Sequence, residues 1–123
     1  MGKVNRFEDL EVWQGAREVV DVIYKLTFRE RFKKDFSLVE QIRRSAVSVM
    51  ANIAEGFHRG SNKDFVKFLG YSRGSLAETI SHLYIALDQN YIAEQEIKEV
   101  IQRADLLWKK INNFISYLTK ERD

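Results

Sequence analysis

The chain has 123 residues, of which 45% are hydrophobic and 31% charged, and a formal net charge of +2; this composition excludes an intrinsically disordered protein. It contains no cysteine, which excludes disulfides, thiolate catalysis and cysteine-based zinc sites. We expect a single domain over residues 1–123. Because it has no run of about 18 apolar residues and no signal-peptide pattern, we also expect no membrane contact and a cytoplasmic location.

The first half of the chain predicts two amphipathic helices. Over residues 8–28, apolar residues recur every three or four positions and share one side of a helix: Leu10, Trp13, Ala16, Val20, Ile23 and Thr27. The second helix is predicted to begin at Ser37, because Ser37 and Glu40 fit a capping box in which each side chain binds a free backbone N–H group. It should end near Gly56. Its apolar side consists of Leu38, Ile42, Ala46, Val49 and Ile53.

The second half predicts two longer helices. Ser61 and Asp64 fit a weaker cap, which opens a third helix of about 28 residues, and Asn90 is a plausible left-handed stop. The fourth helix starts near Ala93, with acidic residues that complement the dipole at its N-terminus. The inward-facing residues are expected to be Phe65, Phe68, Leu69, Leu76, Ile80, Leu83 and Leu87 on the third helix. Those of the fourth helix are expected to be Ile97, Val100, Ile101, Ala104, Leu107, Trp108, Ile111, Phe114, Ile115 and Leu118.

The predicted connections are short, at about nine, five and three residues, and connections of this length join antiparallel neighbours. No segment has the pattern of a strand of useful length. We therefore predict an all-α protein, an antiparallel up-down-up-down four-helix bundle.

The second predicted helix carries a line of polar residues at steps of three, four and three: Ser45, Ser48, Asn52 and Glu55. A buried polar group without a partner costs about 1–3 kcal/mol, so such a line implies partners on another helix, another subunit or a ligand. We predict a buried polar network that joins the second and third helices, inside a subunit or between subunits, with a ligand or partner contact as the alternative. Its members are Arg44, Ser48, Asn52, Glu55, Ser75 and Glu78.

Small residues form a second pattern on the third helix, at steps of four, three and four: Gly70, Gly74, Ala77 and Ser81. Each internal glycine costs roughly 1 kcal/mol against alanine in a helix, so close packing must offset the cost. The pattern indicates a close helix crossing inside the bundle or a contact between subunits.

Two Glu–His pairs are weighed as metal ligands, because four-helix bundles can hold di-metal sites. Glu55 and His58 have Glu-x-x-His spacing, whereas Glu78 and His82 lie four positions apart. A di-iron bundle needs a Glu-x-x-His from two helices and a glutamate from each of the others, and this chain has only two histidines. No serine is paired with a histidine by spacing, and no phosphate loop follows a strand. We therefore predict no catalytic residue, no metal site and no cofactor.

Basic residues are concentrated in the middle of the chain. Residues 29–73 contain ten Lys or Arg and five Asp or Glu, a balance of +5. Such a surface can attract the phosphates of a nucleic acid. The predicted nucleic-acid-binding residues are Arg43, Arg59, Lys63, Lys67 and Arg73. Residues 29–34 are interpreted as a solvated loop that could extend this surface. The aromatic residues expected to pack in the core, and so to offer no stacking platform, are Trp13, Phe65, Phe68 and Trp108.

Six segments carry a resemblance to a known family: FEDLEVWQ at 7–14, QIRRSAVS at 41–48, NIAEG at 52–56, RGS at 59–61, DFVKFL at 64–69 and GSLAE at 74–78. They are similar to the four-helix-bundle family of 23S ribosomal RNA intervening-sequence proteins, over nearly the whole chain. The resemblance implies a small helical protein that assembles into a ring-like homopentamer and has no catalytic activity. A related fold serves as the accessory variability protein of diversity-generating retroelements, where a basic surface contacts nucleic acid and a reverse transcriptase.

Together these features predict a non-catalytic bundle that assembles with copies of itself and binds RNA or another nucleic acid through a basic surface. The alternative is a scaffold that binds a protein partner and has no affinity for nucleic acid. The two differ in salt dependence, because phosphate contacts weaken as salt is added.

Overall fold

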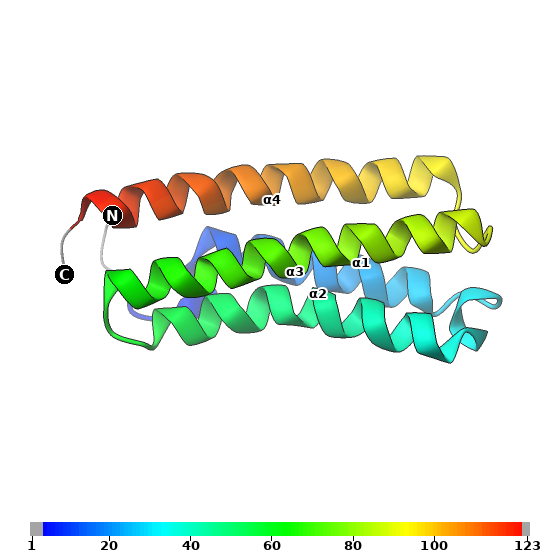
Figure 1. Cartoon of the computed structure of the whole chain (residues 1–123), viewed down its shortest axis with the longest axis horizontal. Coiled ribbons are helices and arrows are strands. Elements are labelled where there is room, and N and C mark those ends of the chain that lie inside the picture. The colour runs from blue at the N-terminus through cyan, green and yellow to red at the C-terminus, as the bar shows by residue number, and fades with distance from the viewer. Residues whose placement is uncertain (1–3, 122–123) are drawn as a thin grey trace.

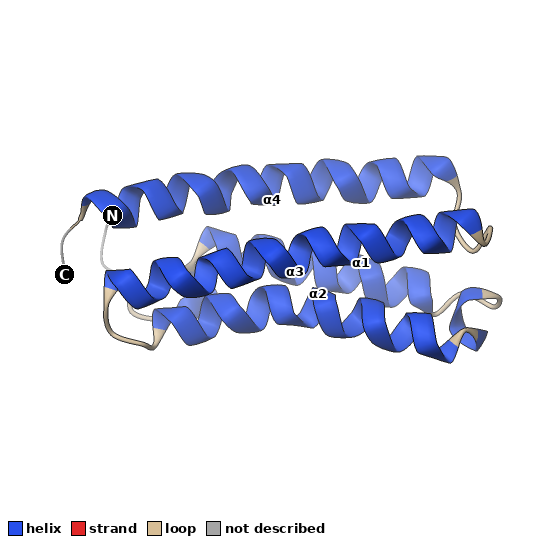
Figure 2. Cartoon of the chain, in the orientation of Figure 1, coloured by secondary structure: helices blue, strands red, loops and turns tan. Residues whose placement is uncertain are grey.

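Four α-helices run back and forth along one axis in the computed structural model, which describes residues 4–121 (Figure 1). They are α1 (Glu11–Thr27), α2 (Phe36–Phe57), α3 (Asn62–Asp88) and α4 (Glu94–Lys120), with short 3-10 helices η1 (Phe7–Asp9) and η2 (Phe32–Lys34). Within the described range all regular structure is helical (Figure 2). Each helix packs against its neighbours in sequence, and α1 and α4 close the bundle. The predicted all-α up-down bundle is therefore confirmed.

The caps explain where the helices begin and end. Ser61 Oγ accepts a hydrogen bond from the Asp64 N–H at 3.1 Å, as its sequence predicts, and Asn90 has a φ of 62°. The capping box predicted at Ser37 is wrong, because Asp35 caps α2 by accepting from the Leu38 N–H at 3.2 Å. A tertiary contact fixes this choice: the other carboxylate oxygen of Asp35 accepts a hydrogen bond from Tyr91 Oη at 3.0 Å.

The core is the inward stripe of each helix. Most of its members follow the predicted periodicity, and the largest fully buried side chains include Ile23, Phe32, Ile42, Ile53, Leu69, Leu76, Leu83 and Ile111. Burial of a side chain of this kind contributes about 1.5–3 kcal/mol. Among the described residues, no helix is long and apolar enough to cross a membrane.

Hydroxyl groups join α2 to α3 inside this core. Ser72 Oγ donates to the Val49 carbonyl of α2 at 2.7 Å. Thr79 and Ser45 Oγ atoms bond across the same seam at 2.9 Å, and all three side chains are buried. The Ile42 carbonyl lies 3.1 Å from Ser45 Oγ and the Ser75 carbonyl lies 2.8 Å from Thr79 Oγ1. Because the two hydroxyls have one proton each, they donate two of these three hydrogen bonds at a time.

Gly56 sets how closely α2 and α3 approach near the α2 C-terminus. A Cβ atom at Gly56 would lie 2.7 Å from Phe68 Cβ and 2.9 Å from a ring carbon of Phe65, too near for either. The α2–α3 contact is the most extensive in the bundle, whereas α1–α4 is the least extensive contact between neighbouring helices. Hydroxyl bonds and this close approach therefore make α2 and α3 the most closely joined pair of helices in the fold.

Replacement of the two kinds of helical glycine should have opposite effects. Gly56→Ala is expected to lower the free energy of unfolding by about 1–3 kcal/mol, since overpacking outweighs the gain in helix propensity. Gly74→Ala is the matched control: a Cβ there has no atom within 4 Å, so stability should rise by about 0.5–1 kcal/mol. Urea unfolding, followed by circular dichroism at a concentration where the chain is monomeric, measures both. Equal stability of Gly56→Ala and the parent would contradict the close approach.

Candidate functional site

The six residues of the predicted polar network do not form one buried network within the chain. Arg44, Glu55 and Glu78 are exposed, and each lies near an ionisable group four residues away in the chain. These pairs are Arg44–Glu40 at 3.6 Å, Glu55–Arg59 at 2.7 Å and Glu78–His82 at 3.5 Å. The predicted network inside a subunit is therefore wrong, because a line at steps of three, four and three drifts by about 80° around a helix of 3.6 residues per turn. It starts in the core at Ser45 and reaches solvent at Glu55.

The other three members are half-buried beside the α2–α3 seam. Asn52 Nδ2 donates to the Ser48 carbonyl at 2.9 Å, and the Ser75 carbonyl accepts from Thr79. An open polar groove of about 450 Å³ lies along this seam, lined by Glu40, Gln41, Arg44, Ser45, Ser48 and Glu78. A network between subunits at this groove stays a prediction.

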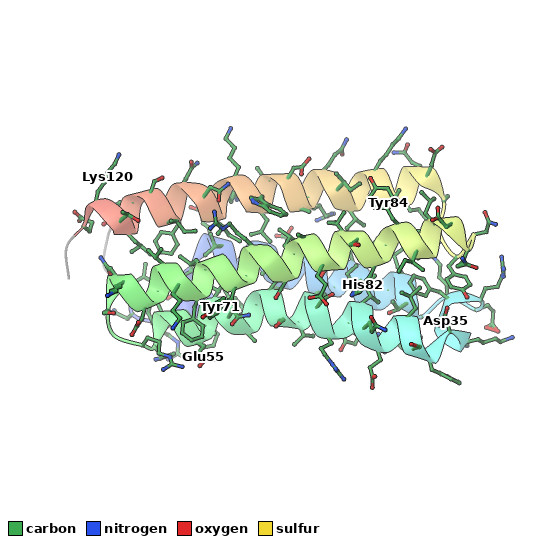
Figure 3. The ribbon with its side chains drawn as sticks, in the orientation of Figure 1. Asp35, Glu55, Tyr71, His82, Tyr84 and Lys120 are labelled. Atoms are coloured by element: carbon green, nitrogen blue, oxygen red, sulfur yellow. The ribbon has the colours of Figure 1, made fainter. Side chains whose placement is uncertain are left out.

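His82 lies in the same region, between α3 and α2 (Figure 3). Its Nε2 atom is buried and makes no hydrogen bond with any described residue, although a carboxylate oxygen of Glu78 lies 3.5 Å away. No group of three or more Asp, Glu or His side chains among residues 4–121 is arranged to hold a metal ion.

The small residues of α3 face outward. The close crossing predicted inside the bundle is wrong, since a Cβ at Gly74 would meet nothing within 4 Å and one at Gly70 would meet only Arg73 Nη2, at 3.8 Å. Ala77 and Ser81 are exposed as well. At 100° per residue, these four positions occupy the middle of the outward side of α3, which we call the small-residue face.

Exposed aromatic residues border the small-residue face. Tyr71 and Tyr84 are 48% and 49% exposed and project from opposite sides of α3, Tyr71 toward α2 and Tyr84 toward α4 (Figure 3). Ile85 adds further apolar surface at 46% exposure. The small-residue face is therefore bordered by Tyr71 on the side of α2 and, thirteen residues further along α3, by Tyr84 on the side of α4.

The predicted nucleic-acid-binding residues lie in three places. Arg59, Lys63 and Lys67 lie around the α2–α3 connection and the first turns of α3, where the Arg59 guanidinium stands 4.7 Å over the Phe68 ring. Arg73 is half-buried and donates to Asn112 Oδ1 of α4 at 2.8 Å.

Arg43 is separate from both groups. Arg43 lies on α2, sixteen residues before Arg59 and so roughly 24 Å from it along the helix axis. Its side chain faces α1. Its guanidinium carbon stands 4.4 Å from the centre of the Tyr24 ring and 5.6 Å from that of Phe28, and its Nε donates to Thr27 Oγ1 at 2.8 Å. The five cations therefore do not form one continuous patch on a single chain.

The loop between α1 and α2 is firmly attached to the rest of the bundle. Phe32 is fully buried and stacks on Tyr91 with ring centres 5.2 Å apart. The hydrogen bond to Asp35 is the main reason that the pKa of Tyr91 is raised. Arg31 donates to the Asn90 carbonyl at 3.3 Å, and Arg29 pairs with Glu96 of α4.

Large aromatic side chains project into solvent around this loop. Phe28 is 70% exposed and Phe36 is 81% exposed, and Arg43 lies over the exposed ring of Tyr24 and near the ring of Phe28. We call Tyr24, Phe28, Phe36 and Arg43 the aromatic corner. Trp13, Phe65 and Trp108 pack in or against the core as predicted. The prediction for Phe68 is wrong, because its half-buried ring lies under Arg59 and against Tyr71, outside the core. The sequence reasoning also missed the exposed set of the aromatic corner. The missed signal was that Phe28 and Phe36 lie outside the apolar stripe of either helix.

Glu96 connects the loop to the start of α4. Both of its carboxylate oxygens accept from Arg29, one of them at 2.7 Å, and Oε1 also accepts from the Ala93 N–H at 2.8 Å. The bond from Arg29 is the main reason that the pKa of Glu96 is lowered from 4.5. A lowered carboxyl pKa means that folding favours the charged form.

Glu96→Gln should therefore destabilise the protein in a pH-dependent way. The substitution keeps an acceptor for the Ala93 N–H but removes the charge, so we expect a loss of about 1 kcal/mol near pH 7. Because the folded pKa is depressed, this contribution is present above about 4.5 and disappears as pH falls through the folded value. Urea unfolding at pH 7 and pH 3 measures the difference, with Glu94→Gln, exposed in the same turn, as the control. An equal loss at both pH values would contradict the ion pair.

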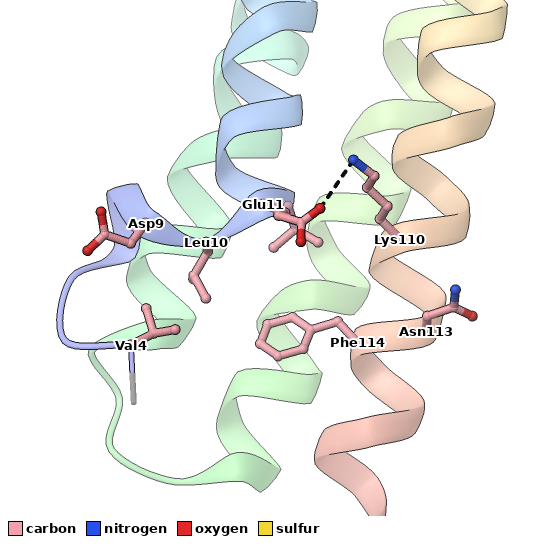
Figure 4. A pocket seen from close by; sticks show the side chains of 8 residues that line it. Val4, Asp9, Leu10, Glu11, Lys110, Asn113 and Phe114 are labelled. Atoms are coloured by element: carbon pink, nitrogen blue, oxygen red, sulfur yellow. Dashed lines mark ion pairs between the residues drawn. The ribbon is translucent and has the colours of Figure 1, made fainter. Parts of the chain in front are cut away.

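A pocket of about 320 Å³ opens between η1, the start of α1 and α4 (Figure 4). Val4, Leu10 and Phe114 supply apolar walls, and Glu11 and Lys110 form an ion pair at 3.5 Å on its rim. The pocket residues include no histidine, serine or cysteine that could act as a nucleophile or as its base: they are Val4, Asp9, Leu10, Glu11, Val12, Lys110, Asn113 and Phe114.

The fold and the outward placement of its polar groups define a small all-helical bundle protein whose distinctive features lie on its surfaces. The chain matches the family of the 23S rRNA-intervening sequence protein over residues 8–113, and it belongs to that family. It is also similar to a crystal structure of a protein with unknown function from the S23 ribosomal protein family of Bacteroides thetaiotaomicron. The TM-score is 0.75 at 25% identity, covering 85% of this chain and 97% of that one. No curated protein matches the chain. The family predicted from the six segments is confirmed.

Proposed function

We propose that this protein is a non-catalytic module that assembles with copies of itself into a ring and binds nucleic acid, RNA in the first place, on the repeated basic surface of that ring. The cytoplasm is its proposed location. The observation that carries assembly is the small-residue face of α3, which has no partner among the described residues of the chain.

Two glycines of α3 have an energetic cost that assembly would offset. Gly70 and Gly74 each weaken α3 by roughly 1 kcal/mol against alanine, and the packing of the bundle does not offset this. A second helix packed on the small-residue face would offset this cost, since small residues allow close approach and the neighbouring Tyr71 and Tyr84 supply area to bury. Five copies per ring is the number that the family resemblance implies.

Charge supports nucleic acid as the ligand of such an assembly. The +5 balance of residues 29–73 is modest for one chain, but a ring repeats it with every subunit. Lys67 is exposed and makes no ion pair within residues 4–121, so its ammonium group is available to phosphate. A-form RNA would be bound through its backbone and shape.

The absence of catalysis is part of the same proposal. Most exposed carboxylates that lie near the grooves are engaged by a cation one turn away or across a seam, as in Arg44–Glu40 and Lys110–Glu11. Such pairs are typical of a solvated helix surface.

A protein-binding scaffold is the second candidate, and the exposed Tyr71, Tyr84 and Ile85 favour it. Protein interfaces are enriched in tyrosine, and a polymerase or other protein could bind the small-residue face in place of another copy of the chain.

Ala77→Glu should disrupt the oligomer while leaving the subunit folded. Ala77 is exposed, so glutamate is tolerated in the single chain. When a second copy packs on the small-residue face, the glutamate would be buried as an unpaired charge. We expect a shift to monomers in sedimentation velocity with unchanged helix content by circular dichroism. Ser116→Glu places the same charge on the exposed side of α4 and should leave assembly intact. Loss of assembly in both variants, or in neither, would refute the α3 interface.

Salt dependence separates nucleic-acid binding from the scaffold. If about five phosphates are contacted per site, log K for a labelled RNA should fall against log salt with a slope of roughly −3.5 to −4.5. Fluorescence anisotropy from low to moderate salt gives the slope, and Lys63→Ala with Lys67→Ala should reduce its magnitude by about 1.5. A flat response, or no binding of any RNA, would favour the scaffold.

A further inference from the structure

The aromatic corner combines exposure with rigidity. Phe28 and Phe36 are the two most exposed of the large apolar side chains in the described range. They flank a loop whose central Phe32 is fully buried, so their backbone positions are held by the core. Single exposed apolar residues are common on protein surfaces, but two phenylalanines and a tyrosine around one anchored loop form a defined aromatic surface.

Arg43 gives this surface a cationic centre. Its guanidinium is held over the Tyr24 ring by the hydrogen bond to Thr27 Oγ1, and it also approaches Phe28. Phe36 and Arg43 lie seven residues apart and therefore on the same side of α2. A planar cation and aromatic rings held in this way can both stack on a nucleobase.

The charges around the aromatic corner favour a polyanion. Arg31, Lys34 and Arg43 make no ion pair with any residue in the 4–121 range. The nearby carboxylates are already engaged: Asp35 binds Tyr91 and the Leu38 N–H, Glu30 pairs with Lys33, and Glu40 pairs with Arg44. Arg43 lies over the rings of Tyr24 and Phe28, and Arg31 and Lys34 belong to the loop that Phe28 and Phe36 flank. Three cations without a carboxylate partner around this loop match a ligand that carries phosphates and flat bases together.

We infer that the aromatic corner binds an unpaired stretch of nucleic acid, with bases stacked on Phe28 and Phe36 and phosphates held by Arg31, Lys34 and Arg43. Bases inside a duplex are already stacked on each other, so this site selects single strands or loops over continuous double helix. The inference rests on the proposed nucleic-acid function and adds to it a site and a ligand class. Because the loop is pre-organised, little ordering free energy opposes binding there.

The test measures binding of a fluorescein-labelled twelve-nucleotide single-stranded RNA and of a duplex of the same sequence, by anisotropy. Phe28→Ala and Phe36→Ala combined should weaken single-strand binding about 5- to 150-fold for each base that loses its stacking, and leave duplex binding unchanged. The salt slope should not change, because no charge is removed. Phe28→Trp with Phe36→Trp retains the rings and should restore affinity. Leu106→Ala, which removes an exposed apolar residue from α4, is the matched control.

Each other result has a definite meaning. If the parent binds neither RNA, the proposed nucleic-acid function fails and the inference fails with it. If the parent binds RNA and the double alanine variant binds equally well, only the inference is overturned. A double variant that changes the sedimentation coefficient without changing RNA affinity would overturn it too, and would assign the aromatic corner to a contact between copies. Circular dichroism checks that the variants are folded.

Discussion

The hydroxyl-bonded seam between α2 and α3 is the constraint from which the remaining surfaces follow. Ser72 and Thr79 occupy core positions of α3 between Leu69, Leu76 and Leu83, and their hydroxyl groups bind α2 instead of water. These bonds fix the rotation of α3 about its axis. With that rotation fixed, the side of α3 that carries Gly70 and Gly74 must face outward, where only another molecule can cover it.

The same seam explains why the buried hydroxyl groups join the helices whereas the rest of the polar line on α2 does not. Ser45 is buried and shares a hydrogen bond with Thr79, whereas Ser48, Asn52 and Glu55 turn progressively toward solvent. Among residues 4–121, the side chains of the buried polar residues Thr27, Ser45, Ser72 and Thr79 are hydroxyls, which need few partners, whereas Asn52 is half-buried and Glu55 is exposed. The stability of the single chain therefore does not depend on buried charge.

The two ends of the bundle differ in the chemistry that they display. At one end Arg59 lies over Phe68 beside Lys63 and Lys67, and at the other the aromatic corner surrounds an anchored loop. A ring of subunits would present each end as a repeated surface, one mainly cationic and the other cationic and aromatic. In the proposed ring, the two surfaces would suit different parts of one structured RNA, a stem and an unpaired loop.

The sequence by itself determined the helices and the family. Apolar periodicity, the cap at Ser61 and the stop at Asn90 are local features, decided by residues within one or two turns, and six short segments carried the resemblance. Only the tertiary structure decided which polar and small residues are buried, because a helix has several polar sides and its rotation is set by contacts with distant segments. The cap at Asp35 depends on Tyr91, and the setting of Arg43 depends on Tyr24 and Thr27 of another helix. Spacing along one helix contains no information about either, so the candidate surfaces emerged only once the helices were packed.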